Sequence, residues 1–166
     1  MSDPSHPESR VIDTSILIQA PLSTVRTVLL DFEAYPTWST FVTSVKHNPA
    51  SSPTAALALG DALTVTINPP GGSPMTMTPK VVHLDERGFG WQGHLANISG
   101  LFDGKHLFLL EQEGDMATRL THREEFGGVL YTPLMSWLGM GAKTKQGFEA
   151  FNEAVKRRAE EVADKQ

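Results

Sequence analysis

The sequence contains no cysteine. Disulfide bonds, thiolate zinc sites and a cysteine nucleophile are therefore excluded. It also has no apolar run of about 20 residues, the length that a membrane-spanning helix needs. Basic residues are scarce, since 14 Lys and Arg stand against 19 Asp and Glu, and this balance argues against a nucleic-acid partner. Phosphate-binding glycine loops and the nucleophile elbow of hydrolases are absent as well.

The composition fits one domain. A chain of 166 residues can bury a core without disulfides or metals. Residues 1–9 have neither the basic nor the apolar region of a signal peptide. We therefore predict a disordered lead-in over residues 1–9, a single domain over residues 10–163 and a cytoplasmic location.

The segment Leu130–Ala163 has the spacing of one amphipathic helix. Apolar residues such as Leu134 and Phe148 recur on one face, and charged residues occupy the other. We predict a continuous helix, about 45 Å long at about 1.5 Å per residue. Gly139 and Gly141 would weaken it near its start. A helix with one apolar stripe is not stable alone in water, so it needs a large apolar partner.

The remaining chain reads as strands, apart from two short helices after the first strand. The first helix starts at Pro21, and the second helix, or a tight turn, covers residues 33–41. Strands are predicted over residues 11–19, 41–47, 63–67, 75–81, 89–95, 101–113 and 117–126. Pro79 implies a bulge or an edge position in its strand. We expect an α+β fold in which a curved antiparallel sheet of about seven strands wraps around the C-terminal helix.

Two predicted strands carry ionisable residues on the face that should meet the helix. His106 and Phe108 share this face on the first strand, and His122 and Glu124 share it on the second. With Gly114–Met116 as the loop, His106 lies opposite Glu124 and Phe108 opposite His122. A slip of two residues would place His106 opposite His122. A slip of one is excluded, because it would turn a polar face inward.

The cluster of His106, His122 and Glu124 has three interpretations. It would satisfy its own polar groups inside the core, or hold an ordered water, because a buried carboxylate is costly without a partner. An imidazole oriented by a carboxylate also suits general acid or base catalysis near neutral pH. Metal binding has the least support, since no tight ligand spacing occurs, and we predict neither a metal site nor a cofactor.

A curved sheet touches a helix along only part of its length, so the rest of the interface would leave a cavity. The candidates for contact with a ligand are Tyr35, Trp38, Phe41, Val65, Met75, Met77, Trp91, Phe108, Leu120, Leu134 and Leu138. The methionines favour an adaptable wall, because thioethers fit irregular shapes. Tyr35 is expected at the cavity mouth, where its hydroxyl would reach a ligand. For any single candidate, an ordinary place in the core is the alternative.

Several motifs together resemble the SRPBCC superfamily, in its polyketide cyclase/dehydrase-like branch. They are Ile18–Pro21 with Val25, Asp31–Trp38, Trp91–Gly93, Gly104–Phe108, Thr118–Gly127 and Asn152–Lys156. The resemblance covers roughly residues 10–160. It implies the helix-grip fold that START lipid-transfer domains and the birch pollen allergen share. Members of the superfamily carry lipids, sense hormones, bind quinones or catalyse cyclisation, so the fold alone does not choose the function.

Two functions follow from these residues. The first, favoured by a narrow margin, is binding of a small hydrophobic molecule such as a lipid, a quinone or a polyketide. The second is a cofactor-independent cyclase or dehydratase, in which His106 and Glu124 move protons. In that enzyme His122 or Tyr35 would stabilise an oxyanion. A protein-interaction module has the same fold but no support from the mixed charges of the last helix, and a monomer or a homodimer is expected.

Overall fold

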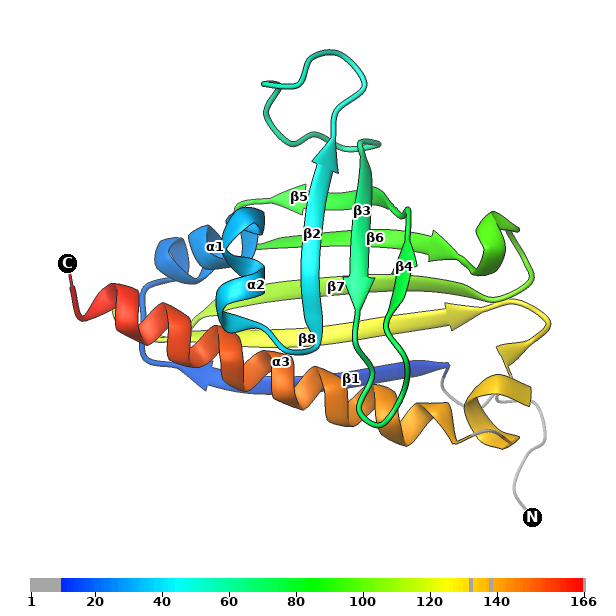
Figure 1. Cartoon of the computed structure of the whole chain (residues 1–166). Coiled ribbons are helices and arrows are strands. Elements are labelled where there is room, and N and C mark those ends of the chain that lie inside the picture. The colour runs from blue at the N-terminus through cyan, green and yellow to red at the C-terminus, as the bar shows by residue number, and fades with distance from the viewer. Residues whose placement is uncertain (1–9, 132, 138, 166) are drawn as a thin grey trace.

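An antiparallel sheet curls around one long helix at the C-terminal end of the chain (Figure 1). The computed structural model describes residues 10–131, 133–137 and 139–165. The strands are β1 (Val11–Ile18), β2 (Val42–Asn48), β3 (Ala62–Ile67), β4 (Met75–Met77), β5 (Lys80–Asp85), β6 (Gly88–His94), β7 (Asp103–Gln112) and β8 (Thr118–Gly127). They follow the order β1-β8-β7-β6-β5-β3-β2, with the short β4 paired to β3. The predicted α+β helix-grip architecture is confirmed.

The helical segments sit where the chain leaves the sheet. They are α1 (Leu22–Leu30), the 3-10 turn η1 (Phe32–Ala34), α2 (Tyr35–Trp38), the 3-10 turn η2 (Leu95–Asn97), the π-helical turn η3 (Pro133–Trp137) and α3 (Met140–Ala163). The two short helices predicted after the first strand are therefore present. Within the described residues, no helix has both the length and the apolar character needed to cross a membrane.

The predicted strand over residues 75–81 is two strands. β4 pairs with β3 through Val65 and Met77, and β5 pairs with β6 through Val81 and Trp91. The break falls at Thr78 and Pro79. Proline has no N–H to donate to the ladder, and here its carbonyl accepts a hydrogen bond from Leu63 N at 2.8 Å instead. The irregularity predicted at Pro79 thus divides one β-hairpin arm into two short strands.

The continuous helix predicted over Leu130–Ala163 is wrong at its N-terminal end. α3 begins only at Met140 and spans 24 residues. Gly139, just before it, has a φ of 65°, which lies in the left-handed region that favours glycine and interrupts a right-handed helix. The preceding turn η3 has π-helical hydrogen bonding. Apolar spacing therefore located the helix but not the backbone break.

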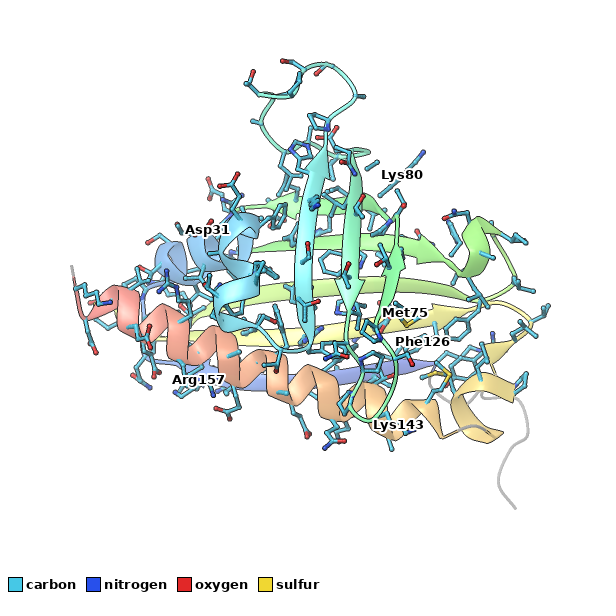
Figure 2. All side chains as sticks on the ribbon, in the orientation of Figure 1. Asp31, Met75, Lys80, Phe126, Lys143 and Arg157 are labelled. Carbon is cyan, nitrogen blue, oxygen red and sulfur yellow. The ribbon has the colours of Figure 1, made fainter. Side chains whose placement is uncertain are left out.

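α3 packs its apolar stripe into the curved sheet. Phe148, Phe151 and Val155 are fully buried, whereas Lys143 and Arg157 are exposed and point away from the sheet (Figure 2). At Gly147 of this helix, a Cβ atom would overlap the ring of Phe41. The phenyl ring thus occupies the space that any larger residue in this helical turn would need.

We expect Gly147→Ala to destabilise the fold. Alanine would normally stabilise a helix interior by roughly 0.5–1 kcal/mol. Here the added methyl group must displace the buried Phe41 ring, and overpacking of this kind costs about 1–3 kcal/mol. Urea denaturation should give a lower free energy of unfolding than in the wild type.

Gly141→Ala is the matched control in the same helix. A Cβ atom there would lie 3.6 Å from the backbone oxygen of Met135, an ordinary contact. This variant should be as stable as the wild type or more so. Equal stability changes in the two variants would show that the Phe41 contact does not limit the residue size at Gly147.

Candidate functional site

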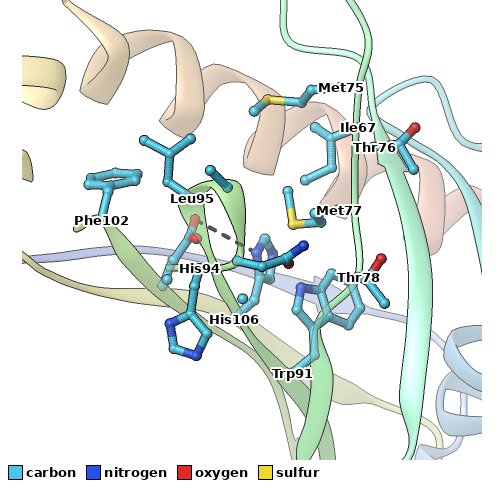
Figure 3. Close-up of a pocket in the computed structure, with 15 residues that line it drawn as sticks. Ile67, Met75, Thr76, Met77, Thr78, Trp91, His94, Leu95, Phe102 and His106 are labelled. Atoms are coloured by element: carbon cyan, nitrogen blue, oxygen red, sulfur yellow. Dashed lines mark ion pairs between the residues drawn. The ribbon is translucent and has the colours of Figure 1, made fainter. Parts of the chain in front are cut away.

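A pocket of about 220 Å³ opens where the β3–β4 hairpin passes over the inner face of β6, β7 and β8 (Figure 3). Its lining is mostly apolar. The lining residues are Ile67, Met75, Thr76, Met77, Thr78, Trp91, Gly93, His94, Leu95, Ala96, Asn97, Phe102, Gly104, His106 and Glu124. His106 and Glu124 are the ionisable groups of the inner sheet face that reach it, so they form its polar base.

The register of three strands brings these two groups together. His106 pairs with Trp91 of β6 on one side and with Glu124 of β8 on the other, and Phe108 pairs with His122. The first of the two predicted registers is therefore confirmed. The side chains of His106 and His122 nevertheless meet diagonally and share a hydrogen bond between their Nε2 atoms. Diagonal neighbours on one sheet face lie within reach of long side chains, so both predicted partners of His106 contact it.

Packing fixes the orientation of each polar side chain. The His106 ring stacks on Trp91 with 5.0 Å between ring centroids, and its Nδ1 lies 3.7 Å from Oε2 of Glu124. The His122 ring stacks on Phe148 of α3 at 3.9 Å. Gly104 leaves space for the carboxyl group, since a Cβ atom there would lie within 2.5 Å of Oε1 of Glu124. The cluster is therefore held between aromatic rings with little rotational freedom.

Burial makes the cluster electrically neutral at neutral pH. It raises the pKa of Glu124 to about 8 and lowers the pKa of His106 to about 3. The pKa of His122 is also lowered, first by burial and second by the proximity of His106. In each case an isolated charge would lose its hydration inside the protein. Glu124 is thus a carboxylic acid beside an unprotonated imidazole, and 16% of its side chain remains exposed.

The structure divides the predicted ligand-binding residues into two groups. Met75, Met77 and Trp91 line the pocket together with His106 and Glu124. The others whose burial is described lie in the core or at its edge: Phe41, Val65, Phe108 and Leu120 are buried, and Trp38 and Leu134 are half-buried. Leu138 lies outside the described residues. Only the residues near the β3–β4 hairpin are brought to the pocket.

Tyr35 and His122 do not have the places expected of them. Tyr35 is fully buried rather than at a cavity mouth, and its hydroxyl donates a hydrogen bond to the carbonyl of Leu29 at 2.8 Å. His122 has no exposed surface and lies behind His106, where its Nδ1 is 3.2 Å from Oδ1 of Asn152. Neither side chain borders the pocket, so neither is in a position to contact a ligand oxyanion there.

Sequence reasoning missed one wall of the pocket. The turn η2 supplies Leu95, Ala96 and Asn97, and the following segment supplies Phe102. Ala96 and Asn97 have φ values of 53° and 58°, which are strained for residues other than glycine. Such strain gathers at functional sites, but a sequence shows it only where glycine or asparagine marks the turn. Asn97 was the available signal.

Sequence reasoning also missed the polar residue that α3 contributes to the histidine cluster, Asn152. Asn152 is only 2% exposed and lies in the apolar stripe of the helix, where its amide contacts His122. A polar side chain at an apolar position of the helical spacing was the signal that could have found it.

Among the described residues, no group of three or more His, Asp or Glu side chains could hold a metal ion.

A family comparison agrees with the fold. The family of polyketide cyclases/dehydrases and lipid transport proteins has a model that matches residues 9–160. The chain belongs to this family. The resemblance to the polyketide cyclase/dehydrase-like branch of the SRPBCC superfamily is therefore confirmed. No curated protein matches the chain.

Solved structures with this architecture share little sequence with the chain. The ZhuI aromatase/cyclase from Streptomyces sp. R1128 has a TM-score of 0.69 and 15% identity, over 90% of this chain and 93% of that one. A START superfamily protein from Mycobacterium smegmatis has a TM-score of 0.62 and 14% identity, over 93% and 97%. A norcoclaurine synthase variant from Thalictrum has a TM-score of 0.67 and 14% identity, over 92% and 94%. At this identity the likeness establishes the fold alone.

We expect Glu124→Gln to change how stability depends on pH. The pKa of Glu124 is about 8 in the folded protein, against an ordinary value of 4.5. The stability that its proton contributes is therefore fully present below pH 4.5 and is lost as the pH rises through 8. Glutamine does not titrate, so the variant should gain stability relative to the wild type between about pH 5 and about pH 8. Urea denaturation across that range measures the difference.

Glu125→Gln is the charge-matched control. Glu125 lies on the opposite face of β8 with 40% of its side chain exposed. Its stability curve should run parallel to that of the wild type. The same pH dependence in both glutamine variants would contradict a protonated Glu124 in the folded protein.

Proposed function

We propose that the protein binds a small, uncharged hydrophobic molecule in the pocket beneath the β3–β4 hairpin. Quinones, polyketide-like ketones and lipids belong to this class. The observation that carries the proposal is the largely buried carboxyl group of Glu124, next to His106, at the base of a mostly apolar pocket. An apolar wall supplies affinity, and one polar group fixes the orientation of the ligand.

The size of the pocket limits what it can enclose. Ligand sites commonly measure about 300–1,000 Å³, whereas this pocket measures about 220 Å³. It therefore takes a small molecule or one end of a longer one. Met75 and Met77 border the opening, and unbranched thioethers can change rotamer to admit more of a ligand.

The chemistry of the base favours a neutral ligand with an oxygen atom. A carboxylic acid donates a hydrogen bond to a carbonyl and also accepts one from a hydroxyl. An anionic head group would have to lose its hydration against apolar side chains, and the neutral His106 at the pocket base offers it no positive charge. The site thus discriminates against charge and selects for a carbonyl or hydroxyl group.

A second candidate function is proton-transfer catalysis of the cyclase or dehydratase kind. The observation that favours it is the 3.7 Å separation between the Glu124 carboxyl and Nδ1 of His106 at the pocket base. In a dehydration, His106 would take a proton from the carbon next to a carbonyl, while Glu124 protonates the departing hydroxyl as water. Structures of the same fold include an aromatase/cyclase and a norcoclaurine synthase, which keeps catalysis among the hypotheses.

Ligand binding predicts a rise in melting temperature with suitable compounds. We expect at least one member of a panel of quinones, aromatic ketones and fatty alcohols to stabilise the wild type, by about 2.7 kcal/mol at a concentration of 100 times its Kd. Gly93→Phe should abolish the gain, because its ring would fill the pocket that Gly93 lines. Differential scanning fluorimetry measures both effects.

Gln92→Phe provides the matched control. Gln92 adjoins Gly93 in β6, and successive strand residues point to opposite faces, so the same ring would lie outside the pocket. This variant should keep the ligand-induced stabilisation. The proposal fails if no compound stabilises the wild type, or if Gly93→Phe responds as the wild type does.

Catalysis predicts a separation of turnover from binding. Glu124→Gln and His106→Ala should each lower kcat by roughly 10²–10⁴-fold, the usual contribution of a general acid or base. Glu124→Gln should keep nearly the same ligand Kd, since glutamine remains a neutral donor and acceptor of similar shape. Steady-state kinetics with isothermal titration measures the two quantities. Full activity in both variants would remove the acid–base assignment.

A further inference from the structure

A line of polar contacts runs from the pocket base through the core to α3 and β1. Nδ1 of His106 faces Glu124, and Nε2 of His106 meets Nε2 of His122. On its other edge the His122 ring meets the amide of Asn152, which in turn contacts Thr14 of β1. His106, His122 and Asn152 are each at most 2% exposed. Neither His122 nor Asn152 lines the pocket, so any effect of these residues on a ligand must pass through His106.

The direction of the hydrogen bonds can be followed from the end of this line that is far from the pocket. Nδ2 of Asn152 donates to Oγ1 of Thr14 at 2.8 Å, which leaves the amide oxygen facing Nδ1 of His122 at 3.2 Å. Amide and carbonyl oxygens only accept hydrogen bonds. The ring nitrogen that faces α3, Nδ1 of His122, must therefore carry the hydrogen.

The remaining proton positions follow one after another. A neutral imidazole carries a hydrogen on one ring nitrogen only, so Nε2 of His122 is an acceptor. The Nε2 atom of His106 that meets it must then donate. His106 is neutral too, which leaves its Nδ1 without a hydrogen, 3.7 Å from Oε2 of Glu124.

We infer that Asn152 fixes the tautomers of His122 and His106, so that His106 turns an unprotonated Nδ1 toward Glu124. Asn152 is a positioning residue, because it acts through two imidazoles and touches no ligand. A carboxylate at Glu124 would face the lone pair of Nδ1, so the contact favours the protonated acid, in agreement with its burial. In the proton-transfer hypothesis, Nδ1 of His106 is the nitrogen that accepts the substrate proton.

The reverse arrangement is equally definite and makes the inference testable. If the amide group of Asn152 were turned over, its nitrogen would donate to Nδ1 of His122. Each hydrogen bond of the line would then reverse, and Nδ1–H of His106 would donate to an ionised Glu124. The two arrangements place the hydrogen of each imidazole on different nitrogens, and nitrogen NMR distinguishes these tautomers.

The deciding experiment is long-range ¹H–¹⁵N correlation spectroscopy on the uniformly ¹⁵N-labelled, ligand-free wild type near neutral pH. We expect the Nδ1–H tautomer for His122 and the Nε2–H tautomer for His106. The Nδ1–H tautomer in His106, or a protonated imidazolium in either residue, would overturn the inference. This test needs no variant and no ligand. The inference deepens the proposed function, yet a failure to bind any compound leaves the tautomer result intact, and the reverse also holds.

Asn152→Leu then tests the assignment to this residue. Leucine has a similar shape but no acceptor, so the second tautomer of both histidines should become populated. Asn48→Leu is the matched control, since Nδ2 of Asn48 donates to Oγ1 of Thr64 at 2.9 Å in an equivalent contact between β2 and β3. It should leave both tautomers unchanged. Unchanged tautomers in Asn152→Leu would show that Asn152 is not the positioning residue.

Discussion

The structure depends on placing three ionisable side chains inside a sheet–helix interface without leaving a charge there. Buried polar groups need partners, and a charge without one would cost far more than any single apolar contact supplies. Here each of the three side chains faces a neutral neighbour: Glu124 faces His106, His106 meets His122, and His122 meets Asn152 of α3. The strand register and the stacking of Trp91 on His106 both meet that requirement.

The pocket lies at the end of the polar cluster where α3 no longer covers the inner face of the sheet. On the α3 side, Phe148 and Phe151 fill the space beside the histidines. Beyond Glu124 that filling ends, and the opening is bordered instead by the β3–β4 hairpin and the strained turn that contains Ala96 and Asn97. Loops and hairpins can be rebuilt without disturbing a core, whereas the polar base cannot. The hairpin and the turn would thus determine which ligand fits, whereas the strand residues His106 and Glu124 determine the polarity of the site.

The sequence predicted the fold and the polar base better than the pocket. Strand alternation and a loop at Gly114–Met116 left His106 opposite either Glu124 or His122, and the structure has the first of these two registers. Hydrophobic periodicity indicates which face of a strand or helix a residue occupies, but not which segment packs against that face. It could not show that Gly139 would break the helix or that Tyr35 would turn its hydroxyl to a backbone carbonyl. Those outcomes depend on packing between segments far apart in the chain.

The two candidate functions use the same chemical state of the site. A protonated Glu124 beside an unprotonated Nδ1 of His106 would anchor a ligand carbonyl in the first function, and the same two groups would supply the acid and the base in the second. What separates carrier from catalyst is therefore the ligand itself, because proton transfer needs an acidic carbon within reach of His106. With about 220 Å³ available, only one end of a long molecule reaches that position. A ligand whose buried end lacks such a carbon is carried unchanged, and one whose buried end has it is positioned for elimination or cyclisation.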